Sequence, residues 1–189
     1  MSLHQKLQQR AAEGRPIRIG LIGAGKFGSM YLAQIPRTPG VQLVAIADLS
    51  PAAARVNLER VGWEAARANA TSVQEALKSG ATWITEDWQA VTREPSIDIV
   101  VECTGNPVAA VDHCLDAFAH GKHVVNVTVE ADAFCGPLLA RRAQQAGVVY
   151  SLAFGDQPAL ICDLVDWART CGFPVVAVSY THLTLPTSD

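Results

Sequence analysis

The 189-residue sequence lacks the features that direct a protein to a membrane or to nucleic acid. No segment approaches the roughly 20 apolar residues of a membrane-spanning helix. The N-terminus, MSLHQKLQQRAAEGR, is polar and has no apolar core of a signal peptide. Basic residues are not in excess, since 15 Lys and Arg against 18 Asp and Glu give a net charge of −3. We therefore expect no membrane and no nucleic-acid partner.

Paired cysteines, internal repeats and low-complexity tracts are also missing. The five cysteines are odd in number, widely spaced and free of any C-x-x-C pair: Cys103, Cys114, Cys135, Cys162 and Cys171. This spacing argues against a disulfide framework and against a zinc site. We expect reduced thiols in a cytoplasmic protein, and no bound metal.

What the sequence does contain is a glycine motif directly after a buried apolar run. Residues 17–22 read IRIGLI and lead into GAGKFG at residues 23–28, which fits G-x-G-x-x-G. Gly23 allows a tight strand-to-helix turn, Gly25 lets the backbone approach a pyrophosphate, and Gly28 allows close helix packing. No Gly-Lys-Ser/Thr follows, which excludes a Walker-type phosphate loop. A glycine turn with only a packing role is the alternative.

An acidic residue completes the motif. Asp48 ends the next apolar run, twenty residues after Gly28, where a carboxylate accepts hydrogen bonds from the adenosine ribose. Its charge would repel the 2′-phosphate of NADP, so the sequence favours NAD. Arg55 follows within the next helix and could soften that preference, so NADP stays an alternative.

Apolar runs alternate with segments of helical periodicity. Six strands are expected, at residues 17–22, in the run ending at residue 48, and at 82–85, 97–102, 123–127 and 148–153. The helices between them have recognisable caps, including a capping box at 72–75 and Asn106 before Pro107. This alternation predicts a doubly wound, parallel α/β Rossmann sheet with the order 3-2-1-4-5-6.

Two helices carry more specific predictions. Val108, Val111, Leu115 and Phe118 recur at helical spacing and predict the core-facing stripe of the helix after Pro107. The helix after the fifth strand is expected at residues 133–146. His113 and His120 are expected on a helix surface and His123 at the start of a strand.

In such a sheet, ligands lie at the carboxyl ends of the strands, near the reversal of strand order. The predicted cofactor contacts come from three segments there: Gly23, Ala24, Gly25, Lys26, Phe27, Gly28, Asp48, Cys103, Thr104, Gly105 and Asn106. For Thr104 to Asn106, a role as helix cap alone is the alternative. Glu130 and Asp156 follow the fifth and sixth strands and are candidates on the substrate side, with helix-capping acids as the alternative.

The stretches IRIGLIGAGKFG, VVECTGNP, GKHVVNVTVEAD and VVYSLAFGDQPALICDLVDWART resemble homoserine dehydrogenase-like oxidoreductases with a C-terminal SAF domain. More broadly, residues 18–176 resemble the amino-terminal domains of homoserine dehydrogenases and of the glucose–fructose oxidoreductase group. The resemblance implies NAD(P)-linked hydride transfer between an alcohol and a carbonyl compound, with a small-molecule substrate and a homo-oligomeric parent protein.

The sequence departs from these families in two places. The Asn-Lys or Glu-Lys-Pro that they carry after the fifth strand is absent, so the catalytic residues stay unknown and homoserine is doubtful as the substrate. Residues 178–187 resemble a translated sequencing adapter. We therefore expect an N-terminal extension at 1–15, a Rossmann domain at 16–174, and a truncated second domain with an artefactual tail at 175–189.

Three functions remain open at this point. The chain is expected to be the cofactor-binding part of a dehydrogenase, inactive alone because its substrate domain is missing. A standalone dinucleotide-binding or redox-sensing module is the first alternative, and a lyase or epimerase that uses NAD transiently is the second.

Overall fold

A computed structural model describes residues 1–154 and 157–177 of the chain. Contacts between Cα atoms divide the chain into two compact units, Met1–Leu152 and Ala153–Asp189. The domain boundaries expected at residues 15 and 174 stay predictions. No helix in the described residues is long and apolar enough to cross a membrane.

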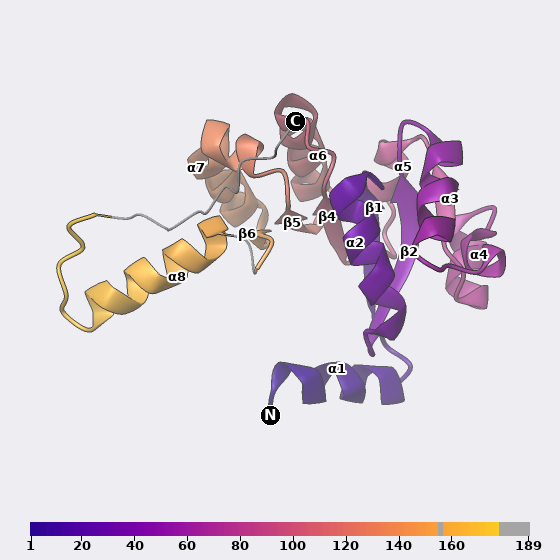
Figure 1. The fold of residues 1–189 in the computed structure, drawn as a ribbon, viewed down its shortest axis with the longest axis horizontal. Helices are drawn as coiled ribbons and strands as arrows, with labels where there is room; N and C mark the ends of the chain where they lie inside the picture. The colour runs from indigo at the N-terminus through magenta and orange to yellow at the C-terminus, as the bar shows by residue number, and fades with distance from the viewer. Residues whose placement is uncertain (155–156, 178–189) are drawn as a thin grey trace, which may run out of the picture. The chain divides into compact units, whose positions relative to one another are not determined.

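The first unit is a parallel sheet of six strands covered by helices (Figure 1). The strands are β1 (Ile17–Ile22), β2 (Val41–Ala47), β3 (Trp83–Thr85), β4 (Ile99–Glu102), β5 (His123–Asn126) and β6 (Tyr150–Leu152). Their order is β3-β2-β1-β4-β5-β6, which confirms the predicted fold. The predicted strands match these bounds closely, because each is a run of apolar residues bounded by turn residues.

The helices of this unit are α1 (Leu3–Ala12), α2 (Lys26–Gln34), α3 (Pro51–Arg60), α4 (Val73–Ser79), α5 (Trp88–Thr92), α6 (Pro107–Ala119) and α7 (Val129–Ala146), with 3-10 turns η1 (Ile35–Arg37) and η2 (Ala65–Ala68). One apolar cluster packs α2 and α3 against one face of the sheet. A second cluster packs α4, α5, α6 and α7 against the other face. Right-handed crossovers that reverse direction after β3 place helices on both faces.

Register brings the carboxyl ends of the central strands together. Ile22 pairs with Ala47 on one side and with Glu102 on the other, and Glu102 pairs with Asn126. Residues that follow these four positions therefore lie at one edge of the sheet.

Helix caps agree with the sequence in most places. Ser50 Oγ accepts from Ala53 N at 3.3 Å, and Pro51 is the first residue of α3. Asn106 caps α6 through its side-chain oxygen. At α4, Ser72 Oγ accepts from Glu75 N, but the Glu75 carboxylate accepts from Thr71 and not from Ser72. The expected reciprocal capping box was therefore wrong in its second half.

Two further expectations were wrong in part. The core-facing stripe of α6 is only in part the predicted one, since Phe118 is buried and Val111 packs against the core, but Val108 is 68% exposed and Leu115 36% exposed. Small residues also face the core, with Ala110, Cys114 and Ala117 fully buried, because α6 and α7 lie against each other. The helix expected at 133–146 begins at Val129 and bends at Cys135, two residues before Pro137, whose ring disfavours the helical conformation upstream.

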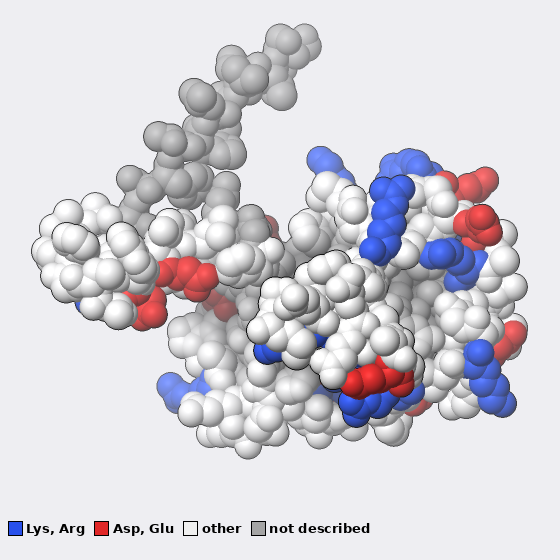
Figure 2. Space-filling view, turned by 90° about the horizontal axis from the view of Figure 1, so that it is seen from below, with Lys and Arg blue, Asp and Glu red and all other residues white. Residues whose placement is uncertain are grey.

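The second unit contains α8 (Gln157–Thr170). Trp167 of α8 and Phe173 beyond it have ring centroids 6.4 Å apart. On the face of the molecule in Figure 2, the described basic and acidic side chains are interspersed and form no continuous patch of one sign.

Candidate functional site

The turn from β1 into α2 contains three glycines with different surroundings. Gly23 has a φ of 94°, and a Cβ there would lie 2.9 Å from backbone atoms of Cys103. A Cβ on Gly28 would lie 2.5 Å from the carbonyl oxygen of Gly23. A Cβ on Gly25 would meet no atom within 4 Å. The space in front of Gly25, at the N-terminus of α2, is therefore open, and a phosphate group fits such a position.

The peptide of Ala24, between the first two glycines, is held from both sides. Its N–H donates to Asp48 Oδ2 at 2.8 Å, and its carbonyl accepts from Asn57 Nδ2 of α3 at 2.8 Å. The other carboxylate oxygen, Oδ1, accepts from Ser50 N at 2.9 Å. Each carboxylate oxygen has two lone pairs, so Asp48 retains acceptor capacity for a ribose hydroxyl.

One guanidinium nitrogen of Arg55, the residue that could soften the preference for NAD, has a backbone partner. It donates to the carbonyl of Ala68 at the end of η2.

A cleft of about 460 Å³ opens at this edge of the sheet. Its lining includes six of the eleven predicted cofactor residues: Gly23, Gly25, Asp48, Cys103, Thr104 and Asn106. The other five (Ala24, Lys26, Phe27, Gly28 and Gly105) lie in the same turns but not in the lining. Leu49, Glu86, Trp88, Ala109 and His113 also line the cleft, although the sequence did not predict them as contacts.

Asn106 and Cys103 have structural tasks in this cleft. Asn106 Oδ1 accepts from Val108 N and Ala109 N at 3.1 and 3.2 Å, as a helix cap does. The Cys103 thiol donates to the carbonyl of Gly23 at 2.9 Å, and burial raises its pKa well above the ordinary value. A protonated, hydrogen-bonded thiol is a poor nucleophile, so Cys103 fastens β4 to the glycine turn.

A fully buried carboxylate lies directly behind the cleft. Glu102 Oε1 accepts from Thr104 N at 3.2 Å and from Thr104 Oγ1 at 2.5 Å, and it lies 3.3 Å from His113 Nδ1. Oε2 accepts from Thr128 Oγ1, whose oxygen in turn accepts from Gly105 N at 3.0 Å. Glu102 thereby fixes the loops after β4 and β5.

The buried network continues across β5 to β6. Asn126 Nδ2 donates to Thr128 O and to Tyr150 OH, at 3.1 and 3.0 Å, and Tyr150 OH donates to Asp132 Oδ1 at 3.0 Å. Burial raises the pKa of Tyr150 well above its ordinary value, more than the hydrogen bond from Asn126 lowers it. A Cβ on Gly136 would lie 2.4 Å from Asp132 Oδ1, so this glycine makes room for the carboxylate.

One of the two predicted substrate-side acids, Glu130, is not among the residues that line the cleft. Glu130 is exposed in the first turn of α7, and Asp156 lies outside the described residues. Among the described residues, no group of three His, Cys, Asp or Glu side chains could hold a metal ion.

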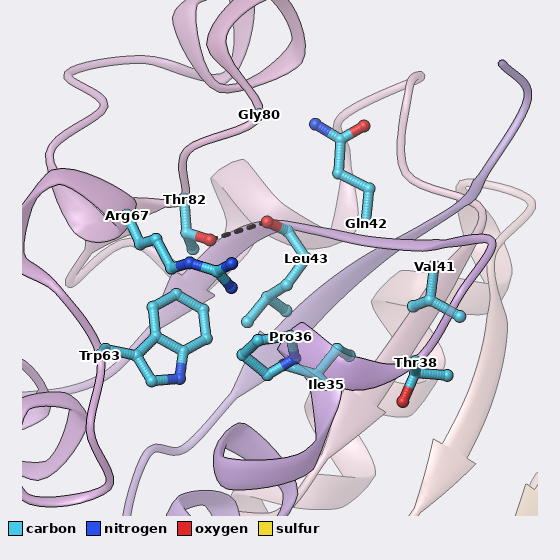
Figure 3. Close-up of a pocket in the computed structure, with 10 residues that line it drawn as sticks. All are labelled: Ile35, Pro36, Thr38, Val41, Gln42, Leu43, Trp63, Arg67, Gly80 and Thr82. Carbon is cyan, nitrogen blue, oxygen red and sulfur yellow. Dashed lines mark hydrogen bonds between the residues drawn. The ribbon is translucent and has the colours of Figure 1, made fainter. Parts of the chain in front are cut away.

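A second hollow, of about 140 Å³, lies at the opposite edge of the sheet (Figure 3). Trp63 and Arg67 line it beside Leu43, whose carbonyl accepts from Thr82 Oγ1 at 2.8 Å. Val41 and Thr82 mark the amino ends of β2 and β3. Because ligands of this fold bind at the carboxyl ends of the strands, we place the functional site in the larger cleft.

His113 is the main residue whose role the sequence prediction missed. It was expected on a helix surface, yet it is 6% exposed, contacts Glu102 and lies 4.6 Å from Trp88 between ring centroids. Its position three residues after Ala110 and four before Ala117 follows the small-residue stripe of α6. That spacing was the available signal.

Fold and site together define a dinucleotide-binding Rossmann domain. The model of an oxidoreductase family with an NAD-binding Rossmann fold matches residues 17–126. The chain belongs to this family of NAD-binding oxidoreductases. A second family model, the catalytic domain of oxidoreductase DRL, matches residues 155–186, which include most of the segment expected to derive from an adapter. The origin of that segment stays a prediction.

The chain is also similar to known dehydrogenases and oxidoreductases. The homoserine dehydrogenase of Pseudomonas aeruginosa is 29% identical over 135 residues, covering 71% of this chain and 28% of the relative. The structure of a homoserine dehydrogenase from Thiobacillus denitrificans has 27% identity and a TM-score of 0.54, covering 72% of this chain and 29% of the other. An NAD-binding oxidoreductase from Klebsiella pneumoniae, at 21% identity and TM-score 0.56, covers 83% of this chain and 39% of the other and shows the same fold.

The predicted likeness to homoserine dehydrogenases is thereby confirmed, and so is the assignment to NAD-binding oxidoreductases. The chain spans about 28% of the length of the curated relatives it matches. The SAF domain stays a prediction.

Proposed function

We propose that this chain is the cofactor-binding part of a longer enzyme that transfers hydride between an alcohol and a carbonyl compound. The observation that carries the proposal is the glycine turn, open in front of Gly25 and tied to Asp48 through the Ala24 N–H. The nicotinamide ring supplies the hydride chemistry when bound. The role of this chain is to hold the pyrophosphate at α2, the adenosine ribose at Asp48 and the second ribose beside Thr104.

Turnover of a substrate requires catalytic residues, and no residue that lines the cleft has been given a catalytic role. We propose that the catalytic groups and most of the substrate pocket lie in the remainder of the longer protein, because the curated relatives are more than three times as long as the matched part. We also propose that the parent protein is cytoplasmic, because its five cysteines are free, as is typical of a reducing compartment. The proposal that the parent protein is a homo-oligomer rests on the family resemblance alone. The chain alone is expected to bind cofactor without turnover.

The experiment is a fluorescence titration of the purified chain with NADH and NADPH, beside an Asp48→Asn variant. The amide keeps one acceptor oxygen for a backbone N–H but removes the charge. We expect the wild type to bind NADH more tightly than NADPH, and the variant to lose most of that preference, since one charge pair near a surface contributes on the order of 1 kcal/mol or more.

Asp98→Asn is the matched control. Asp98 also accepts a backbone N–H, from Arg18 at 2.8 Å, but it lies before β4 at the amino edge of the sheet. This variant should keep the wild-type preference. If neither nucleotide binds to the folded wild-type chain, the glycine turn has only a packing role and the proposal fails.

A further inference from the structure

The hydrogen bonds around Glu102 determine how His113 is protonated. Thr104 Oγ1 accepts from Asn106 N at 3.2 Å and Thr128 Oγ1 accepts from Gly105 N, so both hydroxyl protons are directed to Glu102. The carboxylate is thus surrounded by donors and acts only as an acceptor. His113 Nδ1, 3.3 Å from Oε1, therefore carries a proton and donates it to Glu102.

This arrangement leaves one ring nitrogen of His113 for a ligand. In a neutral imidazole with the proton on Nδ1, Nε2 is an acceptor. The side chain lines the cleft although it is only 6% exposed, so Nε2 is the polar atom that His113 offers to a cleft ligand.

The position of His113 assigns it to the adenosine half of the cleft. Its ring packs on Trp88, and the helix of Trp88, α5, contacts β1 and β2. Asp48, at the end of β2, is the residue placed to bind the adenosine ribose. The two aromatic rings and the 95%-exposed Leu49 supply the apolar surface that a purine ring stacks on.

We propose that His113 reads the base of the dinucleotide, with Nε2 accepting a hydrogen bond from the exocyclic amino group of adenine. The inference rests on the proposed binding of a nicotinamide dinucleotide in this cleft. It makes Glu102 a positioning residue, because the buried carboxylate fixes the tautomer of His113 while the same oxygen also holds Thr104.

The reduced deamino analogue of NADH, in which hypoxanthine replaces adenine, tests this pairing. Hypoxanthine carries a carbonyl oxygen where adenine has its amino group, so an acceptor would face the Nε2 acceptor. We expect the wild-type chain to bind the deamino analogue about tenfold more weakly than NADH, the loss of one buried hydrogen bond. Both dinucleotides fluoresce, so dissociation constants come from the same titration.

His113→Leu removes the acceptor and should bind the two dinucleotides equally, with NADH weakened by about the same factor of ten. His120→Leu is the matched control, because His120 directly follows α6 but bonds to the Asp116 carbonyl and is exposed. This control should keep the tenfold discrimination.

The outcomes separate this inference from the proposed function. Equal binding of both dinucleotides to the wild type overturns the role of His113 and leaves the dinucleotide site intact. The same conclusion follows if His113→Leu keeps the discrimination. If His113→Leu does not fold, the wild-type comparison still decides. If the folded wild type binds neither dinucleotide, the proposed function itself is overturned.

Discussion

Substituting alanine at two of the three glycines should separate folding from binding. Gly28→Ala places a methyl group 2.5 Å from a backbone carbonyl oxygen that cannot move without shifting the turn. Such overpacking costs roughly 1–3 kcal/mol. For a chain of this size that corresponds to a fall in Tm of roughly 2–4 °C per kcal/mol.

Gly25→Ala should mainly weaken binding and have a smaller effect on folding stability. Its φ of −71° lies outside the left-handed region that favours glycine, and its methyl group would meet no protein atom within 4 Å. Alanine is a poorer N-cap than glycine, which costs up to about 1 kcal/mol. The methyl group would instead occupy the space of the pyrophosphate, so NADH affinity should fall by roughly tenfold or more.

The assay pairs thermal unfolding by circular dichroism with NADH titration of each variant at a temperature where it is folded. We expect the larger fall in Tm for Gly28→Ala, and weak binding with a smaller fall in Tm for Gly25→Ala. Wild-type affinity in Gly25→Ala would show that no phosphate approaches this backbone. An unchanged Tm in Gly28→Ala would refute the packing argument.

Two further predictions concern the buried side of the sheet and the thiols. Tyr150→Phe removes the hydroxyl that joins Asn126 to Asp132. Denaturant unfolding should show that the free energy of unfolding falls by roughly 1–3 kcal/mol. An unchanged free energy of unfolding would mean that water replaces the hydroxyl. Iodoacetamide at pH 8 should label the exposed Cys162 and Cys171 in the native chain. It should spare the buried Cys103 and Cys114, because burial raises the pKa of both thiols. Peptide mass spectrometry measures the labelling of each cysteine. Rapid native labelling of Cys103 would contradict its place beneath the glycine turn.

The strand order was predictable because each strand has a local sequence signal. Residues 17–22 and 97–102 are apolar runs, the glycines follow the first, and right-handed crossovers then leave few arrangements. The location of Asp48 at the cleft followed from the same topology. These inferences needed only periodicity and chain direction.

What the sequence could not provide is the choice among hydrogen-bond partners. Glu75 had two neighbouring N–H groups within reach, and only the folded chain shows that Thr71 is the donor. The stripe of α6 was misassigned in part because the periodicity of large apolar residues was used to predict it. The close approach of α7 instead requires small residues at the contact. His113 was misplaced for the same reason.

The clamped peptide of Ala24 has a consequence for the thermodynamics of ligand capture. Because Asp48 and Asn57 immobilise this peptide before any ligand arrives, the conformational entropy of the turn is lost during folding and not during association. A preorganised receptor binds with a smaller entropic penalty. By linkage, a ligand that needs the clamped turn also shifts the folding equilibrium toward it, so the stability of this small loop and its affinity for ligand are one coupled quantity.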